Sequence, residues 1–277
     1  MQISGIETRT IRKVTSLDTS DEEDLLAAEE PLEISISYFE GEKSVKKSIS
    51  VTMRTPGHDD ELALGFLFTE GIIKSKSQVK QVSANVLDEN KMSVYLHEGQ
   101  IPNLNTSERN FYTTSSCGVC GKASIDAIKT TSLYSLQLDD IIIPRDIIFS
   151  LAVQLKKQQE IFESTGGLHA SALFDLAGNF LCLREDVGRH NALDKIIGFT
   201  FNQNNLPLTN RILLLSGRAS FELIQKASMA GIRVVAAIGA PSSLAVQLAE
   251  ESNITLIGFL GKEKFNIYSG FHRISEL

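Results

Sequence analysis

The amino-terminal third of the chain shows strand patterns followed by a helix pattern. Residues 32–39, LEISISYF, and residues 43–53, KSVKKSISVTM, alternate apolar and polar positions, as strands with one buried face do. Gly41 lies between them and predicts a hairpin. Residues 58–72, HDDELALGFLFTEGI, predict a helix whose first turn is acidic, which is favourable at a helix N-terminus, and which ends at Gly71.

Two further strand patterns and a polar loop follow this helix. Residues 79–87 and 91–98 are the strands, and residues 99–110, GQIPNLNTSERN, are the loop. We therefore expect a smaller α+β domain over residues 1–112. Within it, the acidic residues 18–30 carry no strand pattern, and we expect a solvated lead-in or a short helix there.

Beyond residue 112 helix and strand patterns alternate. The expected elements are a helix over 145–163, strands over 168–175 and 179–186, a helix over 188–199, a strand over 211–216, a helix over 220–230, a strand over 233–239, a helix over 243–252 and strands over 254–260 and 264–270. This alternation predicts a three-layer α/β domain over residues 113–277 with a partly parallel sheet. The α-β-β-α-β-α order at its start resembles the cytidine deaminase fold.

Composition narrows the class of protein. The chain has 277 residues and a formal net charge of −7, which argues against broad nucleic-acid binding. No apolar run approaches the roughly 20 residues of a membrane-spanning helix, and the first residues lack the apolar segment of a signal peptide. We expect a cytoplasmic protein without membrane attachment, in which its three cysteines are reduced thiols rather than a structural disulfide.

Two of those cysteines, Cys117 and Cys120, form a C-G-V-C pair in the stretch TTSSCGVCGKASID. Structural zinc needs four ligands, and the chain has no second pair of this kind and only five histidines, so we expect no tightly bound metal. Deaminase zinc chemistry is also disfavoured. Its H-x-E motif would fall at DVGRHNALD, where no Glu stands two residues after His190, and its second cysteine motif would fall at SGRASFEL, which has none.

The surroundings of the pair fit a reactive thiol. Gly118 and Gly121 remove side-chain bulk around the sulfurs, and a helix starting at Lys122 would favour the thiolate. A thioredoxin-like dithiol should follow the first strand of a βαβ unit, whereas this pair follows a polar loop. The third cysteine, Cys182, alternates with apolar residues in a strand pattern and is expected in the core.

Three glycine-containing segments lie where strands meet helices or loops. They are residues 164–169, STGGLH, which end at His169; residues 186–190, DVGRH, with Arg189 and His190; and residues 216–218, SGR, with Ser216 and Arg218. Helix N-termini offer unpaired N–H groups and partial positive charge, which suits phosphate. Together the segments favour an anionic, nucleotide-like ligand, although each also fits an ordinary capped helix.

Taken together, these residues resemble the FdhD family, the formate dehydrogenase accessory sulfurtransferases. The matching stretches run from about Pro31 to the end of the chain. They are MRTPGHDDELALGFLFTEGII, SSCGVCGKAS, TGGLHASAL, REDVGRHNALDKIIG, LLLSGRASFELIQKASMAGI, APSSLAVQLA and TLIGFLGKEKFNIY.

The resemblance implies a sulfur carrier for formate dehydrogenase. Such a protein takes persulfide sulfur from a cysteine desulfurase onto Cys117, with Cys120 assisting. It passes the sulfur to the molybdenum bis-guanine-dinucleotide cofactor before that cofactor enters formate dehydrogenase. The alternative is a chaperone that only binds the cofactor, and a zinc hydrolase is a more distant one. The family also implies a homodimer.

The resemblance places the cofactor-binding segment near the C-terminus. Its residues here are Phe259, Leu260, Gly261, Lys262, Glu263 and Lys264. Relatives often carry a basic residue where this chain has Gly261. Lys262 and Lys264 are the candidates to supply that charge.

Overall fold

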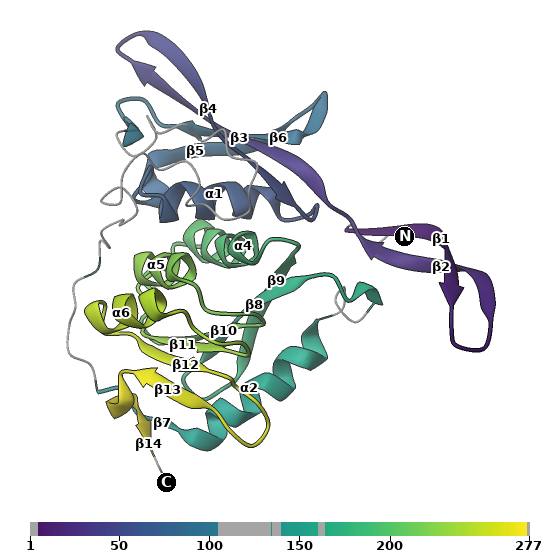
Figure 1. The fold of residues 1–277 in the computed structure, drawn as a ribbon. Coiled ribbons are helices and arrows are strands. Elements are labelled where there is room, and N and C mark those ends of the chain that lie inside the picture. Colours follow the sequence, from purple (N-terminus) through teal and green to yellow (C-terminus); the bar gives the residue numbers. More distant parts are fainter. Residues whose placement is uncertain (1–4, 105–133, 135–139, 160–163, 276–277) are drawn as a thin grey trace.

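The computed structural model describes residues 5–104, 134, 140–159 and 164–275. Within them the chain forms two larger sheets, and helices lie between these sheets (Figure 1). The mixture of helices and sheets agrees with the expected α/β class. Each of the ten helices and strands expected between residues 145 and 270 is present in the expected order.

The amino-terminal sheet has the strand order β4-β3-β6-β5. Its strands are β3 (Glu30–Glu40), β4 (Lys43–Arg54), β5 (Val79–Asn85) and β6 (Asp88–Leu96). The hairpin predicted at Gly41 joins β3 to β4, and Gly41 has the positive φ of +62° that glycine tolerates best. Helix α1 (Asp59–Thr69) covers the inner face of this sheet, as its leucine-rich pattern predicts.

The expectation for residues 18–30 was wrong. Residues Thr19–Ala27 form a strand, β2, which pairs antiparallel with β1 (Ile6–Val14) over nine residue pairs. This hairpin projects from the body of the molecule (Figure 1), so both of its faces meet water. The strand therefore needs no alternation of apolar and polar residues. Cross-strand charge pairs help to hold the two strands together, among them Arg12 with Asp21 at 2.7 Å between Nε and Oδ1.

The larger sheet has the order β13-β12-β11-β10-β8-β9. Its strands are β8 (His169–Asp175), β9 (Phe180–Asp186), β10 (Arg211–Leu215), β11 (Val234–Ala237), β12 (Thr255–Gly258) and β13 (Asn266–Ser269). Strands β10, β11 and β12 are parallel, and the remaining pairings in this sheet are antiparallel. The predicted partly parallel sheet is thus confirmed.

Helices cover both faces of the larger sheet. Helices α4 (Arg189–Asn202), α5 (Phe221–Met229) and α6 (Ser243–Glu251) lie on the face toward the amino-terminal sheet, and α2 (Arg145–Gln158) lies on the other (Figure 1). The helix expected over 145–163 ends at Gln158, and residues 160–163 lie outside the described residues. A small parallel pair, β7 (Ile143–Pro144) with β14 (Ile274–Ser275), has no signal in the sequence pattern.

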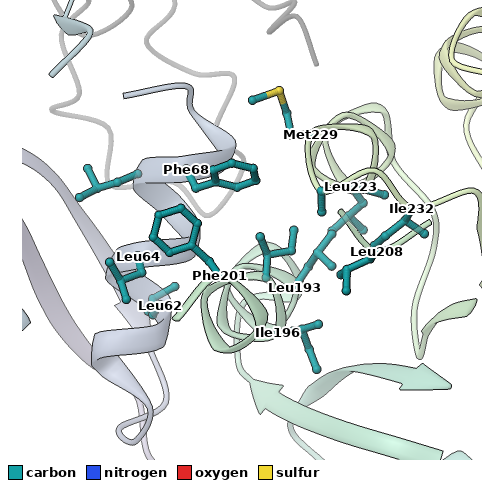
Figure 2. Packing of buried hydrophobic residues seen from close by; sticks show 14 of the residues in the cluster. Leu62, Leu64, Phe68, Leu193, Ile196, Phe201, Leu208, Leu223, Met229 and Ile232 are labelled. Carbon is teal, nitrogen blue, oxygen red and sulfur yellow. The ribbon is translucent and has the colours of Figure 1, made fainter. Parts of the chain in front are cut away.

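One buried cluster joins the amino-terminal sheet to the larger sheet. Leu62, Leu64 and Phe68 of α1 meet Leu193 and Phe201 of α4 (Figure 2). The Phe68 and Phe201 rings pack with centroids 5.3 Å apart. A second cluster fills the space between α2 and the sheet. The expected division of the chain between residues 112 and 113 falls outside the described residues and stays a prediction.

Candidate functional site

Five strand ends of the larger sheet lie at one edge. The parallel strands β10, β11 and β12 end there, β8 begins there, and β9 ends there. The loops that follow are tied together: the Gly239 N–H donates to the Gly217 carbonyl at 3.0 Å, and the Phe259 N–H donates to the Gly239 carbonyl at 3.1 Å. Open α/β sheets bind ligands outside the carboxyl ends of their strands, so this edge is the first candidate for a site.

A cavity of about 1050 Å³ opens at this edge. The second half of α2 forms one wall, and the segments before β8 and after β10, β11 and β12 form the rest. Of the residues predicted to bind a ligand, His169, Ser216, Leu260, Gly261 and Lys262 line it. The fold therefore brings residues from three separate stretches of the sequence to one cavity.

The cavity has a largely apolar lining, and the charged residues among its described lining residues are all lysines. They are Lys156 and Lys157 of the last turn of α2 and Lys262, and no Asp or Glu is among the described residues that line the cavity. A concave surface with charges of one sign concentrates ligands of the other sign, here anions. The sequence reasoning missed Lys156 and Lys157. Their signal, two lysines at the end of an amphipathic helix, also fits an ordinary helix terminus.

His169 lines the cavity, and Arg189, which is not among the described residues that line it, lies close enough to influence the charge of this imidazole. Burial lowers the pKa of His169, and the positive charge of Arg189 lowers it further, while Asp186 opposes both. The imidazole is therefore neutral near neutral pH. Its ring packs against Gly217, where an added Cβ would lie 3.2 Å from the ring Nδ1. The buried Nε of Arg189 has no hydrogen-bond partner among the described residues, which suits a site that receives an acceptor from a ligand.

Two predicted residues point elsewhere. The Nε2 of His190 lies 3.4 Å from Ser220 Oγ and 3.4 Å from Glu222 Oε2, so its ring faces the start of α5. Arg218 is exposed and packs against Gly239. Neither is among the described residues that line the cavity. The side chain of Ser216 lines it but accepts a hydrogen bond from the Ala170 N–H at 2.8 Å, so part of its capacity holds β8 to β10.

The segment from Phe259 to Lys264 forms an exposed turn beside the cavity. Phe259 has a left-handed φ of +53° and is 46% exposed, an unusual backbone for an aromatic residue. The Gly261 N–H donates to the Lys264 carbonyl at 3.0 Å and closes the turn. Glu263 and Lys264 are exposed on it. Strained exposed backbone of this kind concentrates at ligand sites.

The pair Cys117 and Cys120 lies outside the described residues, and its role stays a prediction. Cys182 is a buried free cysteine, as expected, and burial raises the pKa of its thiol to about 11. It is therefore protonated and unreactive at neutral pH. Within the described part of the chain, no group of three or more His, Cys, Asp or Glu residues is placed to hold a metal ion. No described helix is long and apolar enough to cross a membrane.

These features define an α/β protein with a lysine-bearing cavity at the carboxyl edge of its parallel strands. The chain belongs to the FdhD/NarQ family, whose model matches residues 27–275. The resemblance found in the sequence motifs is thereby confirmed.

Curated relatives match the chain along nearly its whole length. The sulfur carrier protein FdhD of Mycolicibacterium paratuberculosis is 48% identical, over 95% of this chain and 97% of its own. The sulfur carrier protein FdhD of Sulfolobus acidocaldarius is 40% identical over 99% of both chains. Among solved structures, a formate dehydrogenase accessory protein from Desulfotalea psychrophila superposes with a TM-score of 0.72. It is 21% identical, and the match covers 98% of this chain and 99% of that one.

Proposed function

We propose that this protein is a sulfur carrier that serves formate dehydrogenase. The observation that carries the proposal is its near full-length similarity to proteins named sulfur carrier protein FdhD. Cys117 is the acceptor. Its thiolate attacks the outer sulfur of a persulfide on a cysteine desulfurase, the donor's S–S bond breaks, and the donor cysteine leaves as a thiolate. Cys117 then carries the persulfide, and Cys120 assists its onward transfer.

The recipient in this proposal is the molybdenum bis-guanine-dinucleotide cofactor, bound as a substrate before it enters formate dehydrogenase. The cavity at the strand edge supports it. The cavity has room for a nucleotide-sized group, and Lys156, Lys157 and Lys262 offer charge for its phosphates. His169 adds a neutral imidazole at the cavity, and nearby Arg189 adds a guanidinium whose buried Nε has no partner among the described residues.

Three finer points belong to the same proposal. The carboxyl-terminal unit is deaminase-like in arrangement without deaminase chemistry, the protein acts as a homodimer, and it works in the cytoplasm. The strand order β13-β12-β11-β10-β8-β9 supports the first point. Analytical ultracentrifugation tests the second.

Sulfur loading tests the central role of Cys117. The purified protein is incubated with a cysteine desulfurase and cysteine, and each cysteine peptide is examined by mass spectrometry for a gain of one sulfur atom. We expect the gain on the Cys117 peptide and its loss in Cys117→Ala. Cys182→Ala is the matched control and should load normally, because that thiol is buried and protonated.

Maturation of formate dehydrogenase separates carrier from chaperone. A carrier loses maturation when Cys117 and Cys120 are both replaced. A chaperone that only binds the cofactor keeps it. Full maturation by the double variant would therefore overturn the sulfur carrier role and favour the chaperone.

A further inference from the structure

The end of β4 is tied to the turn that leads from β9 into α4. Thr55 uses all three of its polar groups for this contact. Its N–H donates to Asp186 Oδ2 at 3.2 Å, and its carbonyl accepts from Lys195 Nζ at 2.8 Å. Its hydroxyl oxygen accepts from the Val187 N–H at 3.1 Å. Thr55 thus makes three hydrogen bonds to residues that lie more than 130 positions later in the sequence, at or next to this turn.

The acid at the centre of this contact is fully buried. Asp186 Oδ2 lies 2.7 Å from Lys195 Nζ, and its side chain is 0% exposed. Its other oxygen, Oδ1, accepts from the Gly188 N–H at 2.8 Å and from Asn191 Nδ2 at 3.1 Å. Asp186 therefore holds Gly188 and Asn191 at the start of α4, and the Thr55 N–H is a further donor to its carboxylate.

A second contact runs beside the first. Asn191 in the first turn of α4 donates from Nδ2 to the Met53 carbonyl at 2.7 Å, and its Oδ1 accepts from Thr52 Oγ1 at 3.2 Å. The segment Thr52–Thr55 thus holds the start of α4 on two sides.

Strand β9, which ends at Asp186, is also held by a residue of the amino-terminal part of the chain. Two residues before Asp186, Arg184 donates to both carboxylate oxygens of Glu61 in α1, from Nε at 2.6 Å and from a terminal nitrogen at 2.8 Å. Burial would raise the pKa of Glu61, but the hydrogen bonds from Arg184 and His58 hold it below its ordinary value. The end of β9 has little freedom of its own.

The turn held in this way carries Arg189, the residue whose buried Nε has no partner among the described residues. Arg189 is also close enough to His169 at the cavity to lower the pKa of that imidazole. A guanidinium discriminates geometry as well as charge, so a small rotation of the turn would misplace its donors.

We propose that Thr55 is a positioning residue for the anion site, acting across the sheets through Asp186 and the Val187–Gly188 turn on Arg189. The inference rests on the proposed function, because it assumes that the cavity takes the phosphates of a guanine nucleotide. The amino-terminal part of the chain thereby sets the nucleotide affinity of a cavity that none of its described residues line.

Guanosine diphosphate is the probe, and isothermal titration calorimetry on the full chain gives its dissociation constant. Thr55→Val keeps the shape and the backbone contacts and removes the acceptor for the Val187 N–H. We expect binding to weaken about five- to tenfold, the effect of one hydrogen bond. Thr55→Ser restores the hydroxyl and should restore the affinity. Thr52→Val, which removes the outer contact to Asn191, should give a smaller loss and serves if Thr55→Val folds poorly.

The matched control is Thr200→Val, which removes another buried threonine hydroxyl from α4. That hydroxyl donates to the Ile197 carbonyl at 2.9 Å within the helix, away from the cavity. The Thr200→Val variant should have lower thermal stability and an unchanged nucleotide affinity. A purely structural role for Thr55 predicts the same behaviour for Thr55→Val.

A double-variant cycle with Arg189→Ala tests the route. If Thr55 acts through Arg189, adding Thr55→Val to Arg189→Ala weakens binding no further. Additive losses, or unchanged affinity in Thr55→Val while the unaltered protein binds, would overturn this inference alone. No binding by the unaltered protein would overturn the nucleotide cavity and this inference together.

Discussion

The backbones of α1 and α4 meet at Gly65 and Gly198. A Cβ on Gly65 would overlap the carbonyl oxygen of Asp194, and a Cβ on Gly198 would overlap the carbonyl oxygen of Glu61. The two helices join the amino-terminal sheet to the larger one, so this contact sets how closely the two halves pack (Figure 1).

Gly198→Ala should therefore destabilise the protein despite alanine's better helix propensity. Alanine would gain up to about 1 kcal/mol from propensity. The overlap with the Glu61 carbonyl forces the helices apart and costs about 1–3 kcal/mol or more. Denaturant unfolding followed by circular dichroism measures the change in the free energy of unfolding.

Gly167→Ala is the control for this substitution. Gly167 has an unstrained φ, and an added Cβ there meets its nearest neighbour, the Ala27 Cβ, at 3.5 Å. Its free energy of unfolding should be nearly unchanged. Equal losses in the two variants would mean that the helix contact is not the cause.

The sequence predicted the second half of the fold better than the first few strands. The run RILLLS predicts β10 because a strand that is buried on both faces is apolar throughout. In the structure four of the five residues of β10 are buried. Residues 18–30 misled because β2 is exposed on both faces, so no apolar period marks it. Its partner β1 holds it by charge pairs, and cross-strand partners are invisible until the register is known.

Lys226 of α5 forms a buried ion pair with Asp194 of α4. Its Nζ lies 2.9 Å from Asp194 Oδ2 and 2.9 Å from Thr69 Oγ1 of α1, so three helices share it. Burial alone would lower the pKa of Lys226, but the nearby carboxylates, chiefly Asp194, raise it. The lysine is therefore charged throughout the physiological range.

Lys226→Met should destabilise the protein by about 3–5 kcal/mol, because it leaves the Asp194 carboxylate buried without a cation. Urea unfolding at pH 7 measures the loss. The double variant Lys226→Met with Asp194→Leu should recover much of it, since neither charge is then buried. A double variant as unstable as Lys226→Met would show that shape rather than charge dominates the site.

His169 should make nucleotide binding depend on pH. Its pKa lies below the ordinary value of about 6.5, so it is neutral at pH 7 and gains a proton only as the pH falls below that value. An anion in the cavity binds the protonated form better. The affinity for guanosine diphosphate should therefore rise from pH 7.5 to about pH 5.5.

His169→Gln supplies the control, because the ligand's own phosphates also titrate near pH 6. That titration is common to both proteins, so only the difference between their pH profiles reports His169. The unaltered protein should gain affinity relative to the variant as the pH falls. Parallel profiles would remove His169 from the anion site.

The sequence predicted the kind of ligand that the site suits more readily than it predicted which residues line the cavity. His169, Ser216 and Lys262 were recognised because each lies at a strand end or in a family stretch, and strand ends converge in an α/β sheet. Lys156 and Lys157 were not, because only the packing of α2 against the sheet turns them toward the cavity. His190 was placed at the site for its position in a helix start, but its ring faces Ser220 and Glu222.

Gly261 offers a way to add charge to the cavity. A Cβ there would meet only the Lys264 carbonyl oxygen, at an ordinary 3.6 Å, so a side chain fits without strain. Gly261→Arg places a guanidinium beside Lys262 at the cavity wall. We expect guanosine diphosphate to bind roughly two- to fivefold more tightly at low salt, the effect of one partly exposed ion pair.

Gly261→Gln, which adds similar bulk without charge, should give no gain. The gain should fall as salt rises from 50 to 500 mM, because screening weakens an exposed charge pair. A gain that persists at high salt, or that the Gln variant shares, would mean that the new side chain acts by packing and that no phosphate lies within its reach.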